Sequence, residues 1–333
     1  MQKARSHFLV VVALIPPLLA QMAGTPENGA KPHHIIVPLG SKILSGVVSG
    51  DPSKPGAQYV IRIHNDANFI VLPHWHPEDE NITVVKGTVF LGNGNVFDRR
   101  SLSEMNVGDY ALVPKKMSHF IWSKTETIIQ VHGIGPFQQI NTDAQQSLSG
   151  WTVDPEKGLV RDPQSASYFK FKLNDRVRSE RGEGVICYGQ HSGKNRITQY
   201  TVQTDDGGRF FETEEQLSAV PRQVSANFGS LTGTWEGVVN GLPQGDFPFT
   251  MSLEQQDENV RGVLAVFFGG AAFRSSTLRN NSVELHWDTP LANFVFRGEH
   301  TAGKLSGQWF TDEGSKGTWA ASKSVEDAKG QMK

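Results

Sequence analysis

Cysteine is almost absent from this chain of 333 residues, which contains one, Cys187. A single thiol excludes an intrachain disulfide, a zinc cluster built on thiolates, and CxxC redox chemistry. An excess of one charge sign is also missing, because 32 Lys and Arg stand against 34 Asp and Glu, for a formal net charge of −2. That balance argues against nucleic acid as a partner, since such binding depends on neutralising phosphates.

Long hydrophobic runs are missing as well, because none approaches the ~20 residues that a transmembrane helix needs. The apolar run at residues 8–20 follows two basic residues and precedes a short stretch of small and polar residues, and Pro16 and Pro17 would interrupt a helix there. This order is typical of a secretory signal. We therefore expect residues 1–24 to be a signal peptide, no membrane span, and a periplasmic or secreted protein; an uncleaved N-terminal anchor is the alternative.

Turn-forming residues are abundant, with 34 Gly and 17 Pro. They separate short apolar runs, and no segment shows sustained helical periodicity, so the sequence predicts an all-β protein. The pattern divides the chain into a β-rich block at residues 31–140, a polar linker at 141–167, a second block at 168–221 and a third at 228–323.

Residues that can bind a metal gather in the first block. Residues 69–76 predict a strand, and because side chains alternate faces along a strand, His74 and His76 point to the same side. A turn follows, and Glu80 opens the next predicted strand, which would return beside the two imidazoles. His119 begins another strand further on. Three imidazoles and one carboxylate suit Fe, Mn, Zn, Ni or Cu and leave coordination positions open.

These residues resemble the two sequence motifs of the cupin superfamily. The first motif, H-x-H-x3-E-x6-G, is matched by His74, His76, Glu80 and Gly87. The second, G-x5-P-x-G-x2-H-x3-N, is matched by Gly108, Pro114 and His119. The departures from the two motifs are Asn68, Lys116 and Ser123. The resemblance covers residues 31–140 and implies a double-stranded β-helix barrel, with a divalent transition metal inside it held by the three histidines and the glutamate.

The resemblance leaves the activity open, because one fold hosts many chemistries. Cupins include dioxygenases, isomerases and lyases, so it implies a metal-dependent enzyme acting on a small oxygen-bearing molecule. It also implies a homodimer. One alternative is a non-catalytic ligand-binding or sensory protein whose β domains contact a cell-envelope partner. Another is a purely structural metal, whose removal would unfold the barrel.

Two further residues of the first block are candidates for the site. His132 shares strand parity with Gln130 and Ile128, which would turn it toward the cavity as a proton-transfer group or a hydrogen-bond partner of a ligand. The alternative is a structural barrel histidine. Glu78 is the fallback ligand if the turn before Glu80 differs from the expected one.

The later blocks carry no catalytic motif. Residues 168–221 are similar to small SH3-like barrels, and Cys187 lies there in an apolar strand, which predicts a buried, inert thiol. Residues 228–323 repeat an apolar-x-Gly-x-apolar signature with tryptophans, as in residues 231–235 and 305–309. This block resembles lipocalin-like up-and-down barrels or curved sheets, and we expect its tryptophans to fill the interior.

Overall fold

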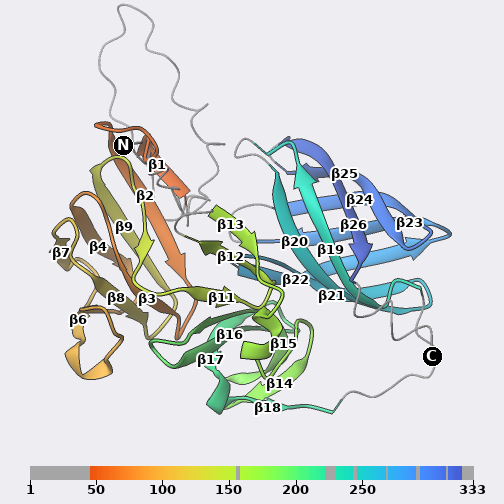
Figure 1. Cartoon of the computed structure of the whole chain (residues 1–333), viewed down its shortest axis with the longest axis horizontal. Coiled ribbons are helices and arrows are strands. Elements are labelled where there is room, and N and C mark those ends of the chain that lie inside the picture. The colour runs from red at the N-terminus through yellow and green to blue at the C-terminus, as the bar shows by residue number, and fades with distance from the viewer. Residues whose placement is uncertain are drawn as a thin grey trace, which may run out of the picture. The chain divides into compact units, whose positions relative to one another are not determined.

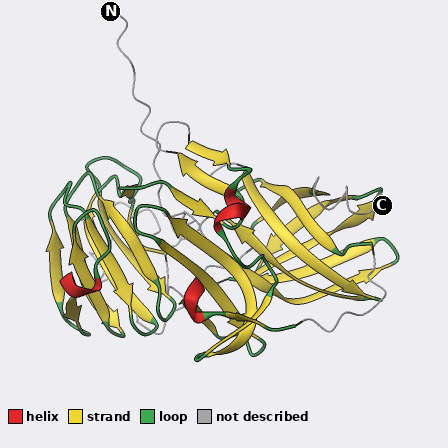
Figure 2. Ribbon diagram, turned by 60° about the horizontal axis from the view of Figure 1, so that its bottom comes forward, coloured by secondary structure: helices red, strands yellow, loops and turns green. Residues whose placement is uncertain are grey.

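The computed structural model describes residues 46–154, 158–221, 230–242, 246–267, 269–289, 293–312 and 314–324. The expected signal peptide at 1–24 therefore lies outside the described residues. The chain divides into two compact units, an N-terminal unit at 1–143 and a C-terminal unit at 144–333. Strands joined by turns make up the described parts, with three short 3-10 helices among them (Figure 2). The predicted all-β class is confirmed.

The N-terminal unit is a sandwich of two antiparallel sheets. Its strands are β1 (Gly46–Gly50), β2 (Gln58–Asn65), β3 (Ile70–Trp75), β4 (Glu80–Lys86), β5 (Val89–Asn93), β6 (Ser103–Met105), β7 (Tyr110–Val113), β8 (His119–Ser123), β9 (Thr127–Ile134) and β10 (Ile140–Asn141), with a 3-10 turn at Arg99–Ser101. One sheet has the order β1-β2-β9-β4-β7 (Figure 1). The other has the order β10-β3-β8-β5-β6. Their apolar faces share one core.

Alternation along the strands decides which side chains enter that core. On β2, Tyr59 and Ile61 are buried, whereas Val60 between them is partly exposed. On β9, Ile129 and Val131 are buried in the core, which turns the residues between and beyond them to the outer face. Burying one side of each sheet against the other is what holds the sandwich together.

The first part of the C-terminal unit consists of antiparallel strands of different lengths. They are β11 (Gln145–Ser147), β12 (Trp151–Asp154), β13 (Gly158–Arg161), β14 (Arg176–Ser179), β15 (Gly182–Ser192), β16 (Ile197–Thr204), β17 (Arg209–Thr213) and β18 (Ser218–Ala219), with 3-10 turns at Ser165–Tyr168 and Glu214–Gln216. The segment 141–167, expected to be a linker, thus contains β11, β12 and β13. The sheet order is β17-β16-β15-β14-β18, with β11 also paired to β15.

The likeness of this sheet to SH3-like barrels stays a prediction. It does not stand apart from the third block, because the hydroxyl of Tyr188 donates a 2.8 Å hydrogen bond to the carbonyl of Phe267. The amide of Ala272 likewise donates to the side-chain oxygen of Gln203 at 2.8 Å. Cys187 is fully buried, as expected, whereas the inertness of its thiol stays a prediction.

The second part of the C-terminal unit is a closed barrel. Its strands are β19 (Gly233–Asn240), β20 (Phe247–Gln256), β21 (Asn259–Val266), β22 (Gly269–Arg279), β23 (Ser282–Asp288), β24 (Asn293–Thr301), β25 (Lys304–Thr311) and β26 (Lys316–Lys323). Each strand pairs with the next, and β26 pairs back to β19. The up-and-down barrel is confirmed and the curved-sheet alternative is wrong, whereas the relation to lipocalins stays a prediction.

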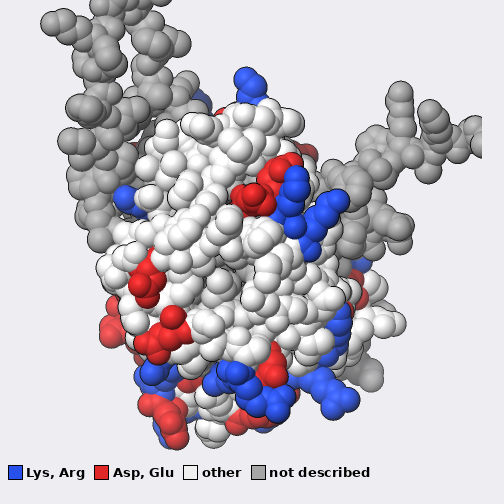
Figure 3. Space-filling view, turned by 90° about the vertical axis from the view of Figure 1, so that its left-hand side faces the viewer, with Lys and Arg blue, Asp and Glu red and all other residues white. Residues whose placement is uncertain are grey.

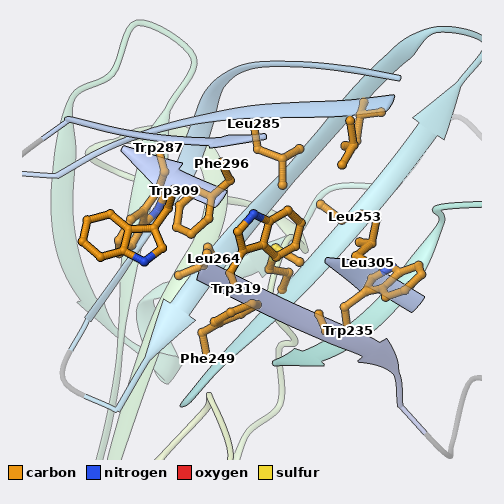
Figure 4. Close-up of a cluster of buried hydrophobic side chains, with 14 of the residues drawn as sticks. Trp235, Phe249, Leu253, Leu264, Leu285, Trp287, Phe296, Leu305, Trp309 and Trp319 are labelled. Carbon is orange, nitrogen blue, oxygen red and sulfur yellow. The ribbon is translucent and has the colours of Figure 1, made fainter. Parts of the chain in front are cut away.

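Tryptophan side chains fill the interior of this barrel. Trp235, Trp309 and Trp319 are 0%, 1% and 1% exposed (Figure 4). Each indole N–H donates to a backbone carbonyl, those of Leu231, Asn240 and Arg297 respectively. The polar group of each ring is therefore satisfied while its apolar body packs the core. The expectation that the tryptophans form a packed interior is confirmed.

The surface of the molecule carries charges of both signs close together. On the face that Figure 3 shows, lysine and arginine lie next to aspartate and glutamate in small clusters separated by uncharged surface. Lys86, for example, pairs with Glu126 at 2.8 Å. Among the residues that the structure describes, no helix has the length and apolar character needed to cross a membrane.

Candidate metal centre

The four predicted ligands come from three strands of the N-terminal unit. His74 lies near the end of β3 and His76 just after it, Glu80 begins β4, and His119 begins β8. β3 and β8 are paired, and their register sets His74 directly opposite His119. β4 belongs to the other sheet, so Glu80 approaches the imidazoles because the intervening turn crosses between sheets. The expected return of this strand beside the imidazoles therefore takes place across the two sheets, without pairing of β3 and β4.

The four side chains converge in the buried interior. The three histidines each offer a nitrogen, and these atoms lie within 4.8 Å of one another. Oε2 of Glu80 lies 3.4 Å from Nε2 of His76 and 3.1 Å from Nε2 of His119. All four residues are at most 5% exposed. Residues that are separated in the sequence thus form one cluster.

Backbone carbonyls hold the outer nitrogen of each imidazole. Nδ1 of His74 is 2.8 Å from the carbonyl oxygen of Leu72. Nδ1 of His76 is 2.7 Å from that of Gln138, and Nδ1 of His119 is 3.3 Å from that of Met117. A carbonyl only accepts, so each Nδ1 must carry the proton and donate it. The tautomer that results leaves Nε2 unprotonated, as a metal ligand requires.

The inner atoms of the cluster lack a hydrogen-bond partner. Nε2 of His76, Nε2 of His119 and Oε2 of Glu80 are all buried without one in the described part of the chain. Burying three lone-pair-bearing atoms face to face is costly unless something positive lies between them. This donor set of neutral nitrogens and a carboxylate oxygen fits a divalent transition ion.

The protonation states of the cluster favour the same occupant. Burial lowers the pKa of His74 well below its ordinary value, and His119 and His76 act in the same direction. Burial also lowers the pKa of His76, although Glu80 opposes that shift. Burial alone would raise the pKa of Glu80, but its contacts with His119 and His76 outweigh burial and lower it. Neutral imidazoles beside an ionised carboxylate are the forms that bind metal.

Two aromatic residues next to the cluster were missed by the sequence analysis. The ring of Phe137 stacks on that of His76, with centroids 4.9 Å apart and planes 19° apart. The ring of Tyr59 lies 5.6 Å from that of Phe137. Burial raises the pKa of Tyr59 above its ordinary value, and the charge of Glu80 raises it further. The alternation of apolar residues along β2 was the available signal for placing Tyr59 inside.

The other two candidates lie outside the cluster. His132 is exposed, because the neighbouring Val131 points inward and leaves His132 on the outer face of the sheet. Its predicted role facing the cavity is therefore corrected. Glu78 is also exposed, in the turn before Glu80. It is not needed as a fallback ligand.

Two departures from the motifs adopt a backbone conformation that favours glycine. Lys116 has φ +64° and Asn68 has φ +67°. The Lys116 amide donates a 2.8 Å hydrogen bond to the carbonyl of His76, so its turn contacts the ligand segment. Asn68 has a compensating bond, because its side-chain oxygen accepts from the indole N–H of Trp122 at 2.9 Å. The turn forms despite the lysine, at the cost of local strain.

Lys116→Gly should raise the free energy of unfolding by about 0.5–1 kcal/mol. Relief of the left-handed conformation outweighs the extra freedom of glycine in the unfolded chain. Urea unfolding measures the change. The matched control is Asn68→Gly, which should bring no gain because it removes the acceptor of the Trp122 indole N–H. Equal stabilisation by both substitutions would contradict this account.

A family model supports the fold of this unit. Residues 31–154 match the model of the family described as Cupin. The match extends beyond the expected limit at residue 140 and includes β12. Together with the two five-stranded sheets, it identifies the N-terminal fold as a cupin β-sandwich. No curated protein matches the chain.

Several solved structures are similar to part of the chain. A cupin-2 domain protein from Shewanella frigidimarina is 18% identical, over 26% of this chain and 81% of its own, with a TM-score of 0.21. A double-stranded β-helix protein from Klebsiella pneumoniae is 18% identical, over 31% and 87%, with a TM-score of 0.24. A cupin sugar phosphate isomerase from Silicibacter pomeroyi is 14% identical, over 49% and 71%, with a TM-score of 0.21.

Proposed function

We propose that the N-terminal unit binds one divalent transition ion and that the protein is a metal-dependent enzyme acting on a small oxygen-bearing substrate. The ligands are Nε2 of His74, His76 and His119 and the carboxylate of Glu80. One observation carries the proposal: backbone carbonyls occupy every Nδ1, while buried inner atoms of the same cluster have no partner among the described residues. A cluster serving only to pack the core would not aim its lone pairs at one another.

The residues around the ion would prepare it for chemistry. A bound ion of this kind polarises a substrate oxygen or supports reaction with dioxygen. Glu80 offsets part of its charge, the carbonyl bonds keep the imidazoles aligned, and Phe137 covers one face of His76. Four protein ligands leave positions open on an ion that prefers six. Dioxygenase, isomerase and lyase chemistry all fit this arrangement.

The proposal also covers the location of the protein and the role of its C-terminal unit. A signal peptide at residues 1–24 would direct the protein to the periplasm or out of the cell. The C-terminal unit would then serve contacts with a cell-envelope partner, because the packed tryptophans of its barrel take up the interior where a ligand would otherwise bind. A small-molecule substrate would be handled by the N-terminal unit alone.

Elemental analysis of the full-length protein, coupled to oxygen uptake, tests the proposed function. We expect close to one transition ion per chain, because the donor set binds a single ion. Iron together with oxygen uptake would identify an oxygenase. Zinc or manganese without uptake would favour isomerase or lyase chemistry, or the non-catalytic alternative. A protein that takes up none of Fe, Mn, Zn, Ni or Cu after loading would refute the proposal.

A further inference from the structure

Tyr59 is a buried residue with a polar group near the metal cluster, and it is not one of the proposed ligands. It lies on the inward face of β2 and is 4% exposed. Its ring is 5.6 Å from Phe137, which in turn stacks on His76. Aromatic contact thus connects the phenol to one of the proposed ligands.

Gly133 shows where the phenol reaches. It lies opposite Tyr59 in the register of β2 and β9. A Cβ atom added at Gly133 would meet the Tyr59 hydroxyl at 3.0 Å and the carbonyl oxygen of Asp79 at 3.0 Å. The tyrosine therefore lies across β9 at Gly133, where the backbone has no side chain, and its hydroxyl lies beside the turn that leads into Glu80. A side chain at position 133 would displace it.

The hydroxyl of Tyr59 makes no hydrogen bond in the part of the chain that the structure describes, and it keeps some accessible surface, unlike the fully buried unpartnered atoms of the cluster. An accessible hydroxyl in an otherwise buried residue can bond to water or to a bound molecule. A phenol is protonated at neutral pH and can donate. Its position beside the turn that leads into Glu80 makes it available as a donor to a guest of the metal centre.

The charge of the interior limits which guest can supply the acceptor. Within residues 46–143, Arg62 is the only buried lysine or arginine. It lies on the opposite strand parity from Tyr59, and its Nε donates to the side-chain oxygen of Gln130. Besides Arg62 and the four proposed ligands, the buried polar side chains of these residues are the uncharged Asn65, Asn68, Ser123 and Thr127. A doubly charged ion beside one carboxylate retains a single positive charge, which one negative charge on a guest would neutralise.

We infer that Tyr59 donates a hydrogen bond to the guest of the metal centre, and that this guest is a small monoanionic oxygen ligand such as a carboxylate, phenolate or enolate. The inference rests on the proposed metal function and deepens it. A phosphate monoester or another dianion would bring a second charge into a compartment that offers it no buried guanidinium or ammonium within residues 46–143.

Acetate binding to the cobalt(II)-loaded full-length protein tests the inference. Visible absorption of cobalt reports first the uptake of the metal and then the titration with acetate. Tyr59→Phe should weaken acetate binding about tenfold, the loss of one hydrogen bond to a charged oxygen, with cobalt affinity unchanged. The matched control is Tyr110→Phe, at an exposed position on β7, which should bind acetate like the wild type. Sulfate, a dianion, should bind the wild type at least about tenfold more weakly than acetate.

The outcomes separate this inference from the proposed function. Failure of the wild type to take up cobalt would refute both the inference and the proposed function. Normal cobalt uptake with equal acetate affinity in Tyr59→Phe and the wild type would overturn the inference alone. Loss of cobalt affinity in Tyr59→Phe would also overturn it, because the phenol would then act on the ligands. Sulfate binding as tight as acetate would overturn the proposed charge of the guest.

Discussion

His74→Ala should lower the affinity for a divalent transition ion by more than about 100-fold while the N-terminal sandwich stays folded. Losing a residue that only orients a ligand typically costs 10–100-fold in affinity, and losing the ligand itself costs more. His74 also lies directly opposite His119 in the strand register, so its loss opens the cluster on one side. Competition with a chromophoric chelator measures the affinity, and circular dichroism monitors the fold.

The control for this substitution is His132→Ala. His132 is exposed on the outer face of β9, so its loss should leave metal affinity within about twofold of the wild type. Turnover, once a substrate is known, should disappear in the His74 variant and persist in the other. Equal affinities in the two variants would remove the proposed ligand set.

Trp309→Ala should destabilise the C-terminal barrel by about 3–5 kcal/mol, the usual cost of deleting a buried tryptophan. The indole is 1% exposed and lies 5.9 Å from the ring of Phe294. Its N–H donates a 2.9 Å hydrogen bond to the carbonyl of Asn240. Truncation leaves both a cavity and an unpaired carbonyl. Urea unfolding followed by circular dichroism measures the loss.

The control lies next to it on the same strand. Gln308 points outward and is exposed, so Gln308→Ala should change the free energy of unfolding by less than about 0.5 kcal/mol. Metal uptake should be the same in both variants, because the proposed ligands belong to the other compact unit. A loss in Trp309→Ala no larger than that in Gln308→Ala would mean that the barrel interior is loosely packed.

Sequence patterns predicted the strands that carry the candidate site because turn residues mark the ends of those strands. Residues 80–85 and 119–123 alternate or run apolar between turn residues, and they became β4 and β8. The two-residue strand β10 and the short strands within 141–167 were missed. Such segments have no period of their own and are ordered by pairing with distant strands, as β11 is with β15.

The candidate site was predictable to the extent that side-chain identity determines it. Motif spacing singled out His74, His76, Glu80 and His119, and the structure brings them together. The partner of the His76 Nδ1 was not predictable, since any residue has a carbonyl and Gln138 lies far away in the sequence. The sequence analysis placed His132 on the wrong face of β9. The apolar residues on the other parity of that strand take the interior positions, and this pattern was visible in the sequence.

The closure of the C-terminal barrel sets the order in which it can assemble. Every pair of neighbouring strands in the ring is consecutive in the sequence except one. At that seam the first strand, β19, pairs with the last, β26, and Trp235 lies opposite Lys323. Local hairpins can form as the chain emerges, but the seam must wait for the final strand and bears the entropic cost of the whole intervening chain. Until then the two edge strands of the unclosed sheet have unpaired backbone groups that can pair with a strand from another molecule. A ribosome that stalls before Lys316 would therefore release a species prone to aggregate.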